Sequence, residues 1–316
     1  MSRLRSIARR GLGTFVALAG IVIVVFIAVR AVPGDPVDQL LGDQATDSDR
    51  AQLRARMHLD GSLAQQFTGM VSDFADGTLG TSYTLGGAPT PVMSLIVENL
   101  PHTVALAVAS LLVAMMIALP MGLLAAVFQD RSVDHLARAV ALIAISTPAF
   151  VSGPLALYAL AVVFPIVPTP AHDSSSLQSL VLPSCVIGFA LSGRLARLLR
   201  ATALEQLRSD YVLAARARGL SGRHIVTRHV LPNAVLPVLT VLGLQLAALL
   251  GGALVTEKIF GRPGIGTLLL DGIAARDHAV VQGCVVVIGV AYTVINGGVD
   301  LAYGWIDPRI RTERQA

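Results

Sequence analysis

The sequence predicts an all-α integral membrane protein with six transmembrane helices and with both termini on the cytoplasmic side. Of its 316 residues, 54% are hydrophobic and only 14% are charged, whereas a soluble globular domain carries about 25% charged residues. The hydrophobic residues are concentrated in six runs that contain no Asp, Glu, Lys or Arg. Uncharged runs of about 18 residues or more are typical of membrane spans, and in lipid such a backbone satisfies its own hydrogen bonds by forming helices.

Each of the six uncharged runs is interpreted as one span. The shortest, the fourth, has 17 residues, and it can lengthen if Arg194 extends its guanidinium to the headgroups. The first run follows a basic stretch, as in a signal peptide, but its 19 residues exceed the usual apolar core of about 7–15. We therefore expect an uncleaved first span. The expected spans are Gly11–Val29, Thr103–Phe128, Ala139–Phe164, Leu177–Gly193, Val230–Thr256 and Ala279–Val299.

The arginines predict the orientation, because cytoplasmic loops are enriched in Lys and Arg. With six spans, the arginine-rich segments all fall on one side, whereas the long loop after the first span is acidic. Both termini are therefore expected in the cytoplasm. The arginines on the cytoplasmic side are Arg3, Arg5, Arg9, Arg10, Arg131, Arg138, Arg194, Arg197, Arg200, Arg208, Arg216, Arg218, Arg223, Arg228, Arg309, Arg311 and Arg314.

This topology divides the chain into four segments. Residues 1–31 hold the cytoplasmic N-terminus and the first span, 32–98 form an extracytoplasmic loop, 99–305 hold spans two to six, and 306–316 form a cytoplasmic tail. The loop is expected to be a small helical cap. Helical spacing of apolar residues and capping residues predict helices in Asp47–Leu59 and Ser62–Phe74, and turn residues fill Gly77–Pro91.

Two further segments are expected to depart from a straight transmembrane helix. "STPAF" (Ser146–Phe150) predicts a bend in the third span, since proline frees backbone carbonyls in a membrane helix. "GTLLLDGIAA" (Gly266–Ala275) predicts a re-entrant or interfacial helix. Polar and aromatic residues in the spans are candidates for lining a transport path, although helix packing is their commoner role. These candidates are Ser146, Thr147, Phe150, Gln245 and Asn296.

Catalytic and cofactor signatures are absent from the sequence. The single lysine, Lys258, follows Glu257, so the chain has no Gly-Lys phosphate-binding loop. The histidines are scattered, and the two cysteines, Cys185 and Cys284, lie inside apolar runs, where buried free thiols are expected. We therefore expect no catalytic residue, no metal site, no cofactor and no nucleic-acid partner.

The basic stretch "DYVLAARARGL" (Asp210–Leu220) separates the fourth and fifth runs. Asp210 can cap a helix that begins at Tyr211, and Gly219 suits the left-handed residue that ends it. Three alanines make this helix thin, so a partner can approach closely. By composition alone, the segment fits either an amphipathic linker on the headgroups or a docking helix. Its expected apolar surface consists of Tyr211, Val212, Leu213 and Leu220.

The stretch Leu213–Gly219 resembles the cytoplasmic-loop signature of bacterial ABC importer permeases. That signature consists of Glu-Ala-Ala, then any three residues, then Gly. Ala214 and Ala215 stand at the alanines and Gly219 at the glycine, whereas Leu213 replaces the glutamate. Six other segments look like the dipeptide/oligopeptide/nickel branch, in particular its first permease subunit. They are "VPGDPV" (32–37), "GTLGTSY" (77–83), "NLPHTVALA" (99–107), "STPAF" (146–150), "FGRPGIGTLL" (260–269) and "DPRIR" (307–311).

The resemblance implies a non-catalytic permease of the bacterial inner membrane that forms half of the path for peptides or related small solutes. Its implied partners are a second permease, two ATPase subunits that hydrolyse ATP, and an extracytoplasmic binding protein. The basic stretch would be the coupling helix that inserts into an ATPase cleft. The implied interface comprises Asp210, Tyr211, Leu213, Ala214, Ala215, Ala217, Arg218, Gly219 and Leu220.

Two other classes of function compete with this hypothesis. A self-contained secondary transporter or channel would work without ATP and would usually contain inverted repeats, which the sequence does not show. A membrane-embedded enzyme would need a nucleophile and base, or a metal cluster, at one depth, and no such set is evident.

Overall fold

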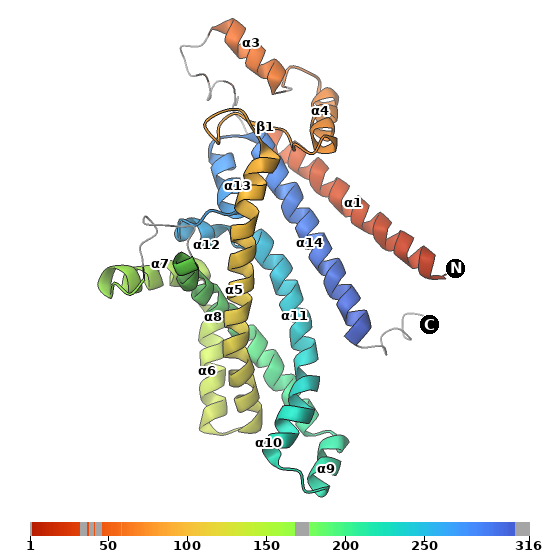
Figure 1. The fold of residues 1–316 in the computed structure, drawn as a ribbon, viewed down its shortest axis with the longest axis vertical. Helices are drawn as coiled ribbons and strands as arrows, with labels where there is room; N and C mark the ends of the chain where they lie inside the picture. The colour runs from red at the N-terminus through yellow and green to blue at the C-terminus, as the bar shows by residue number, and fades with distance from the viewer. Residues whose placement is uncertain are drawn as a thin grey trace. The chain divides into compact units, whose positions relative to one another are not determined.

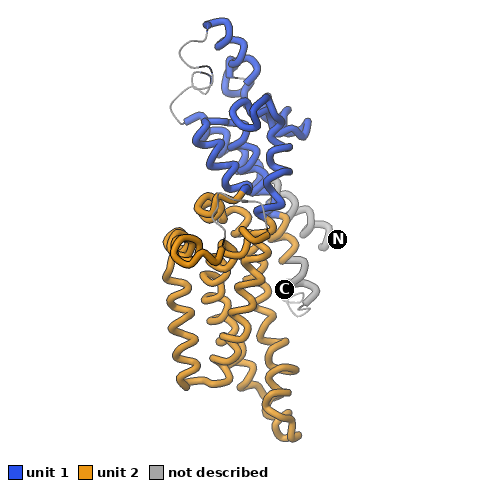
Figure 2. The backbone as a smooth tube through the Cα atoms, turned by 60° about the vertical axis from the view of Figure 1, so that its left-hand side comes forward, with its two compact units in different colours: residues 1–103, 263–293 blue, residues 104–262, 294–316 orange. Residues whose placement is uncertain are grey.

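The computed structural model describes residues 2–31, 37, 41, 46–57, 59–167 and 177–306, and Figure 1 shows their arrangement into elements. The chain forms two compact units, coloured separately in Figure 2: residues 1–103 with 263–293, called unit 1, and residues 104–262 with 294–316, called unit 2. Residues 32–36 of "VPGDPV" and all of "DPRIR" lie outside the described residues.

Unit 1 is mainly helical and contains one small hairpin. Its hairpin pairs β1 with β2 in antiparallel fashion, with Thr81 opposite Pro91. The unit also takes the beginnings of two long helices, α5 and α14, which continue into unit 2. The elements are α1 (Ser2–Ala31), α3 (Asp47–Arg56), α4 (Leu63–Ala75), β1 (Thr81–Ser82), β2 (Thr90–Pro91), α5 (Val92–Val127), α13 (Ile265–Ala274) and α14 (His278–Ile306).

Local sequence explains the two helices of the expected loop. Thr46 caps α3 and Ser62 caps α4, and each makes a capping box with the residue three positions later. Phe67 on α4 packs edge to face on Phe26 of α1, with ring centroids 5.2 Å apart. The predictions of helices in Asp47–Leu59, Ser62–Phe74 and Gly266–Ala275 are confirmed as α3, α4 and α13.

Unit 2 is a helical bundle in which α8 packs against both α6 and α11. The core is made largely of alanine, leucine and valine from α5, α8, α9, α10 and α11, with Leu195 and Leu199 of α8 fully buried. The further elements are α6 (Ser132–Ser146), α7 (Ala149–Leu157), the π-helix η1 (Tyr158–Val163), α8 (Leu177–Leu207), α9 (Asp210–Ala217), α10 (Gly222–Ile225), the π-helix η2 (Val226–Val230), α11 (Leu231–Gly252) and α12 (Leu254–Ile259).

The described residues contain four helical segments long and apolar enough to span a membrane, or five if one bent pair is counted as a span. The four are Val92–Val127, Leu177–Leu207, Gly222–Gly251 and His278–Val299. The first expected span, Gly11–Val29, lies within α1, of which Val16–Ala31 is an apolar helical segment. Six spans and the cytoplasmic location of the termini therefore stay predictions.

The third expected span is bent, as "STPAF" predicted. α6 and α7 meet at an angle of 97°, because Thr147 and Pro148 adopt extended backbone conformations between them. Proline disfavours helical geometry in the residue before it, so the bend lies where "STPAF" predicted it. The fourth span is also longer than expected: α8 continues to Leu207 instead of ending near Gly193. Leucines and alanines at helical spacing continue its buried face.

Close helix packing in unit 2 depends on glycine at two positions. A Cβ added to Gly193 of α8 would lie 2.5 Å from the carbonyl oxygen of Ala141 on α6. One added to Gly122 of α5 would lie 2.7 Å from the carbonyl oxygen of Ala196 on α8. Small residues let membrane helices approach until their backbones nearly touch.

Replacing Gly193 by Ala is therefore expected to destabilise the protein, although alanine alone favours a helix by about 1 kcal/mol over glycine. The clash with a backbone carbonyl should outweigh this gain and cost about 1–3 kcal/mol. The matched control is Gly297→Ala in α14, where no atom lies within 4 Å of the added Cβ. Thermal unfolding of the purified variants in detergent would measure both effects. A Gly193→Ala variant as stable as the control would contradict the close approach.

Candidate functional site

Helix α9 is the element for which the resemblance predicts a docking role. It comprises Asp210–Ala217, and Ser209 occupies the N-cap position with an extended backbone. The expectation that Asp210 caps a helix starting at Tyr211 was therefore wrong by one residue. Asp210 instead lies in the first turn, where a carboxylate interacts favourably with the helix dipole.

The C-terminus of α9 has the predicted glycine termination. Gly219 adopts a left-handed conformation with φ of +79°. Its N–H donates to the carbonyl of Arg216 at 2.9 Å, and the N–H of Leu220 donates to the carbonyl of Ala215 at 3.3 Å. This pair of bonds is a Schellman motif, which satisfies carbonyls that the helix leaves open.

The two faces of α9 differ sharply in exposure. Val212 and Ala215 are each only 1% exposed and belong to the hydrophobic core of unit 2. Leu213 is 69% exposed. The expected exposure of Val212 was therefore wrong, and Ala215 faces the bundle rather than a partner. The exposed residues of the segment are Asp210, Tyr211, Leu213, Ala214, Arg216, Ala217, Arg218, Gly219 and Leu220.

Hydrogen bonds add to the apolar anchoring of this segment. The Tyr211 hydroxyl donates to Oε1 of Gln206, near the end of α8, at 2.8 Å. Thr202 of α8 donates its hydroxyl to the carbonyl of Ala234 on α11 at 2.8 Å. α9 follows α8 in the chain, and its buried face belongs to the hydrophobic core that α8 and α11 also form.

A buried ion pair joins the start of α6 to α8. The side chain of Asp134 is fully buried, and Arg200 donates to it from Nε and Nη2, each at 2.7 Å. Arg138 approaches the same carboxylate at 3.3 Å, and the N–H of Asp130 donates to it at 2.9 Å. Sequence analysis treated Arg138 and Arg200 as topology signals and missed this cluster. The only sequence signal for such a cluster was an aspartate, Asp134, in a segment that also contains arginines.

A second anchor that the sequence did not reveal lies after α12. Arg262 is 2% exposed and donates from Nη1 to the hydroxyl of Ser179 on α8 at 2.6 Å. Phe260, also buried, packs with Leu182 and Val186 of α8. "FGRPGIGTLL" contains a turn with a positive φ at Gly261, and its first residues fix α12 to α8.

The candidate path residues fall into separate groups. Ser146, Thr147 and Phe150 lie at the break between α6 and α7, and Phe150 is well exposed. Thr147 donates its hydroxyl to the carbonyl of Ile143 at 2.8 Å. Gln245 is half-buried on α11, and Asn296 on α14 has a buried amide oxygen without a hydrogen-bond partner among the described residues. Their role in transport stays a prediction.

The two cysteines are free thiols in different surroundings. Cys284 is buried, as expected, whereas Cys185 is exposed on α8, so the expectation of burial was wrong there. Helical periodicity explains the difference, because Cys185 faces away from the side on which Ser184, Val186 and Ile187 are buried.

Comparison with known proteins gives matches along most of the chain. Residues 118–312 match the family described as binding-protein-dependent transport system inner membrane component. Residues 3–107 match the corresponding N-terminal family of membrane components.

Two curated relatives match over nearly their full length. The probable D,D-dipeptide transport system permease protein DdpB of Escherichia coli K12 is 39% identical, with 94% of this chain and 95% of that protein covered. The glutathione transport system permease protein GsiC of the same strain is 35% identical, with 98% and 99% covered.

Solved structures show a related fold. The MetNI methionine ABC transporter in an inward-facing conformation gives a TM-score of 0.57 at 21% identity, covering 69% of this chain and 98% of that chain. An amino acid ABC transporter with histidines gives 0.51 at 16% identity, covering 68% and 94%. The helical fold is thus that of the membrane subunits of such transporters.

The buried Asp134 cluster should contribute to the free energy of unfolding. Replacing Arg200 by Met leaves a buried carboxylate without its main partner and is expected to cost about 3–5 kcal/mol of unfolding free energy. The double variant Asp134→Leu, Arg200→Met removes both charges and should recover most of that loss. Thermal or denaturant unfolding in detergent would measure this, and a single variant as stable as the wild type would show that the pair contributes nothing.

Proposed function

This chain belongs to the family of binding-protein-dependent transport system inner membrane components, and on that premise we propose that it is a permease subunit of an ATP-driven importer in the bacterial inner membrane. It would form half of the translocation path and would itself catalyse no reaction. The family match and the full-length similarity to two transport permeases support this assignment.

We propose small peptides as the class of substrate. One relative is named for D,D-dipeptide transport and another for glutathione transport, and glutathione is itself a short peptide. Both matches extend over nearly the entire chain, so they include the N-terminal region as well as the bundle. Related small solutes remain within the proposal, because in this kind of system a binding protein selects the substrate.

The two-faced helix α9 is the observation that carries the mechanism. Val212 and Ala215 fix one face to the core shared by α5, α8, α10 and α11, while Leu213 projects from the other face. We propose that an ATPase subunit binds this exposed surface, so that closure of the ATPase pair on ATP moves α9 and, through its buried face, α8 and α11. Within this exposed surface, the proposed interface comprises Asp210, Tyr211, Leu213, Ala214, Ala217, Arg218, Gly219 and Leu220.

This assignment requires partner subunits. The single lysine is not part of a Gly-Lys phosphate-binding loop, so ATP would be hydrolysed by two separate ATPase subunits. A second permease would supply the other half of the path, and an extracytoplasmic binding protein would deliver the substrate. Within this chain, the bend between α6 and α7 is the proposed path lining, with Ser146, Thr147 and Phe150 at its corner.

Purification of the tagged chain from its native cell in mild detergent tests the proposed assembly. We expect mass spectrometry to identify a second permease of the same family and at least one ATPase with a phosphate-binding loop. Recovery of the chain alone or as a homo-oligomer, even after crosslinking, would favour a self-contained secondary transporter or channel instead.

The coupling role of α9 predicts the effect of a charge on its exposed face. Leu213→Asp should leave the fold intact, because the side chain contacts little of its own unit, but it should place a charge in an apolar interface. We expect peptide uptake into proteoliposomes that contain the assembled transporter to fall by about tenfold or more, which corresponds to a loss of at least about 1.4 kcal/mol of coupling free energy. ATP hydrolysis continues if the ATPase subunits stay bound, and it disappears from the purified complex if they dissociate.

The matched control is Gly222→Asp, which adds the same charge at the first residue of α10, where no atom lies within 4 Å of the added Cβ. An acidic residue is favourable at a helix start, so uptake should be retained. Uptake at the wild-type level in Leu213→Asp would contradict coupling through this surface. A charge at Ala215 would be uninformative, because that side chain is buried in the core.

A further inference from the structure

A shallow groove lies in unit 2 where α5, α6 and α8 meet. It encloses only about 10 Å³, which is enough for a single water molecule at most. A soluble ligand would therefore not be enclosed there, whereas a molecule that lies along the protein surface can rest on the groove. The lining surface is almost entirely apolar and is formed largely by the small residues Gly122, Ala125, Ala137, Ala141 and Ala196.

Three arginines border this groove, and no acidic residue does. Arg200 donates twice to the buried Asp134, and Nε of Arg138 lies 3.3 Å from the same carboxylate. One carboxylate thus faces two guanidinium groups, whose side chains remain 21% and 44% exposed. Because an arginine carries five N–H donors, both side chains keep donors for a further acceptor.

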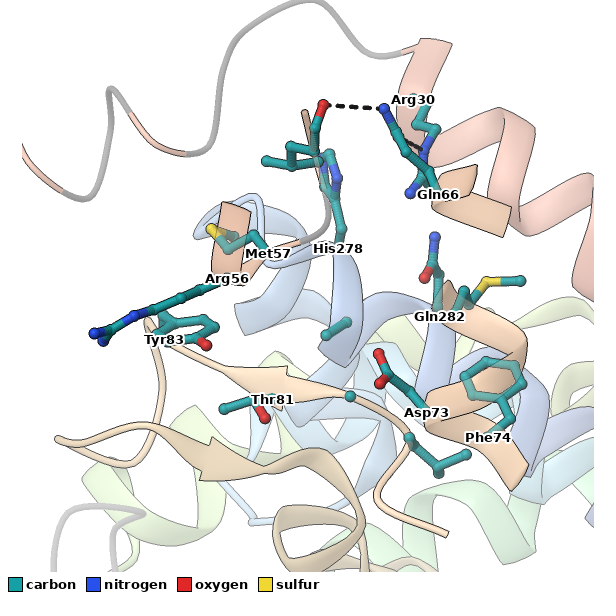
Figure 3. A pocket seen from close by; sticks show the side chains of 15 residues that line it. Arg30, Arg56, Met57, Gln66, Asp73, Phe74, Thr81, Tyr83, His278 and Gln282 are labelled. Carbon is teal, nitrogen blue, oxygen red and sulfur yellow. Dashed lines mark hydrogen bonds between the residues drawn. The ribbon is translucent and has the colours of Figure 1, made fainter. Parts of the chain in front are cut away.

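The third arginine, Arg197, is exposed and has no hydrogen-bond or ion-pair partner in the part of the chain that the structure describes. Arg194, three residues earlier on the same side of α8, is exposed as well. Arg30 in a pocket of unit 1 differs, because its Nε donates to Oε1 of Gln66 at 2.7 Å (Figure 3). After Asp134 has neutralised one of the three bordering arginines, two positive charges remain at the groove.

All of these charges lie at one end of the pair formed by α6 and α8. The two helices cross where Gly193 meets the backbone of Ala141. On one side of this crossing, residues 142–146 of α6 and 177–192 of α8 contain no Asp, Glu, Lys or Arg, and Ile143 is 59% exposed. The arginines lie on the other side. Positive charge at the end of an exposed apolar helix pair is the arrangement expected at the depth of the lipid headgroups.

The chemistry that fits both parts of this surface is that of a phospholipid. A phosphodiester is an anion whose oxygens can accept from several guanidinium donors at once. The acyl chains would cover the apolar part, which a free phosphate would leave uncovered. Basic pockets between membrane helices on the cytoplasmic side bind the headgroups of anionic lipids in this way. An open groove suffices for such a ligand, because the bilayer itself holds the lipid against the protein.

The excess of positive charge distinguishes among lipids. A zwitterionic headgroup would bring its own cation toward unpaired guanidinium groups, whereas an anionic headgroup would bring only negative charge. The general enrichment of arginine in cytoplasmic segments accounts for the presence of these residues on one side of the membrane. It does not require that Arg138 and Arg197, which come from different helices, border the same apolar groove.

We propose that this groove binds one anionic phospholipid of the cytoplasmic leaflet. The lipid phosphate lies between Arg138 and Arg197, and an acyl chain follows the exposed apolar face of α6. The choice of leaflet rests on the proposed topology of the permease. The groove itself lies within unit 2, so the proposal depends neither on the transported substrate nor on the ATPase partners.

Native mass spectrometry of the full-length chain in nonionic detergent, titrated with phosphatidylglycerol, tests the site. We expect one phosphatidylglycerol to bind with saturation, and phosphatidylcholine with the same acyl chains to bind more weakly by about fivefold or more. A large excess of inorganic phosphate should not displace the lipid, because it gains nothing from the apolar part of the groove.

Arg197→Gln removes one positive charge from the groove without breaking an interaction within the fold, and it should weaken phosphatidylglycerol binding by about fivefold or more. Arg197→Lys keeps the charge and should retain most of the affinity. The matched control is Arg223→Gln, which removes the same charge from an exposed position on α10 outside the groove and should bind like the wild type.

Thermal unfolding separates loss of the site from loss of the fold. Without lipid, Arg197→Gln and the wild type should unfold at the same temperature. Phosphatidylglycerol should raise the midpoint of the wild type, since a ligand that binds the folded state stabilises it, and should raise that of Arg197→Gln less. Equal binding of phosphatidylglycerol and phosphatidylcholine would overturn the proposal, as would equal weakening by Arg197→Gln and Arg223→Gln or unchanged binding by Arg197→Gln. Displacement of the lipid by inorganic phosphate would indicate a site for a free anion instead.

Discussion

The close approach of α8 to its neighbours is the constraint on which the rest of unit 2 depends. Gly193 meets the backbone of α6, and Gly122 of α5 meets the backbone of α8. Lipid tails are as apolar as leucine, so helices in a membrane are held together by van der Waals contact and hydrogen bonds rather than by exclusion of water. Because contact requires proximity, small side chains at the crossing points allow the buried leucines of α8 to pack.

Packing against the bundle also explains why a helix as short as α9 is stable. An isolated helix of this length is marginal in water, but α9 is fixed by Val212 and Ala215 in the core and ended by the left-handed Gly219. The alanines consequently have two roles. Ala215 lets α9 lie against the bundle, whereas the exposed Ala214 and Ala217 leave room for a partner. A bulkier buried residue would lift the helix from α8 and α11.

Much of this arrangement could be predicted from the sequence, and the exceptions have physical causes. Hydrophobic runs predicted the long helices, capping residues predicted α3 and α4, and Gly219 predicted the end of α9. The face of α9 that is buried could not be predicted, because Val212 and Leu213 are equally apolar and only the packing of α8 and α11 distinguishes them. The ion pair between Asp134 and Arg200 joins residues 66 positions apart, a separation that no local pattern reveals.

The Asp134 cluster shows how unit 2 satisfies a buried charge from within the fold. In unit 2, the Asp134 carboxylate receives two bonds from Arg200, one from a backbone N–H and the nearby charge of Arg138. Its acceptor capacity is filled from within the fold, so it has no need of a ligand. In unit 1, the amide nitrogen of Gln282 is buried without an acceptor among the residues that the structure describes. Asn296 on α14, in unit 2, likewise has a buried amide oxygen without a partner among the described residues, so a charge such as Asp134 is satisfied more completely within this fold than a neutral amide, in keeping with the larger cost of burying an unpaired charge.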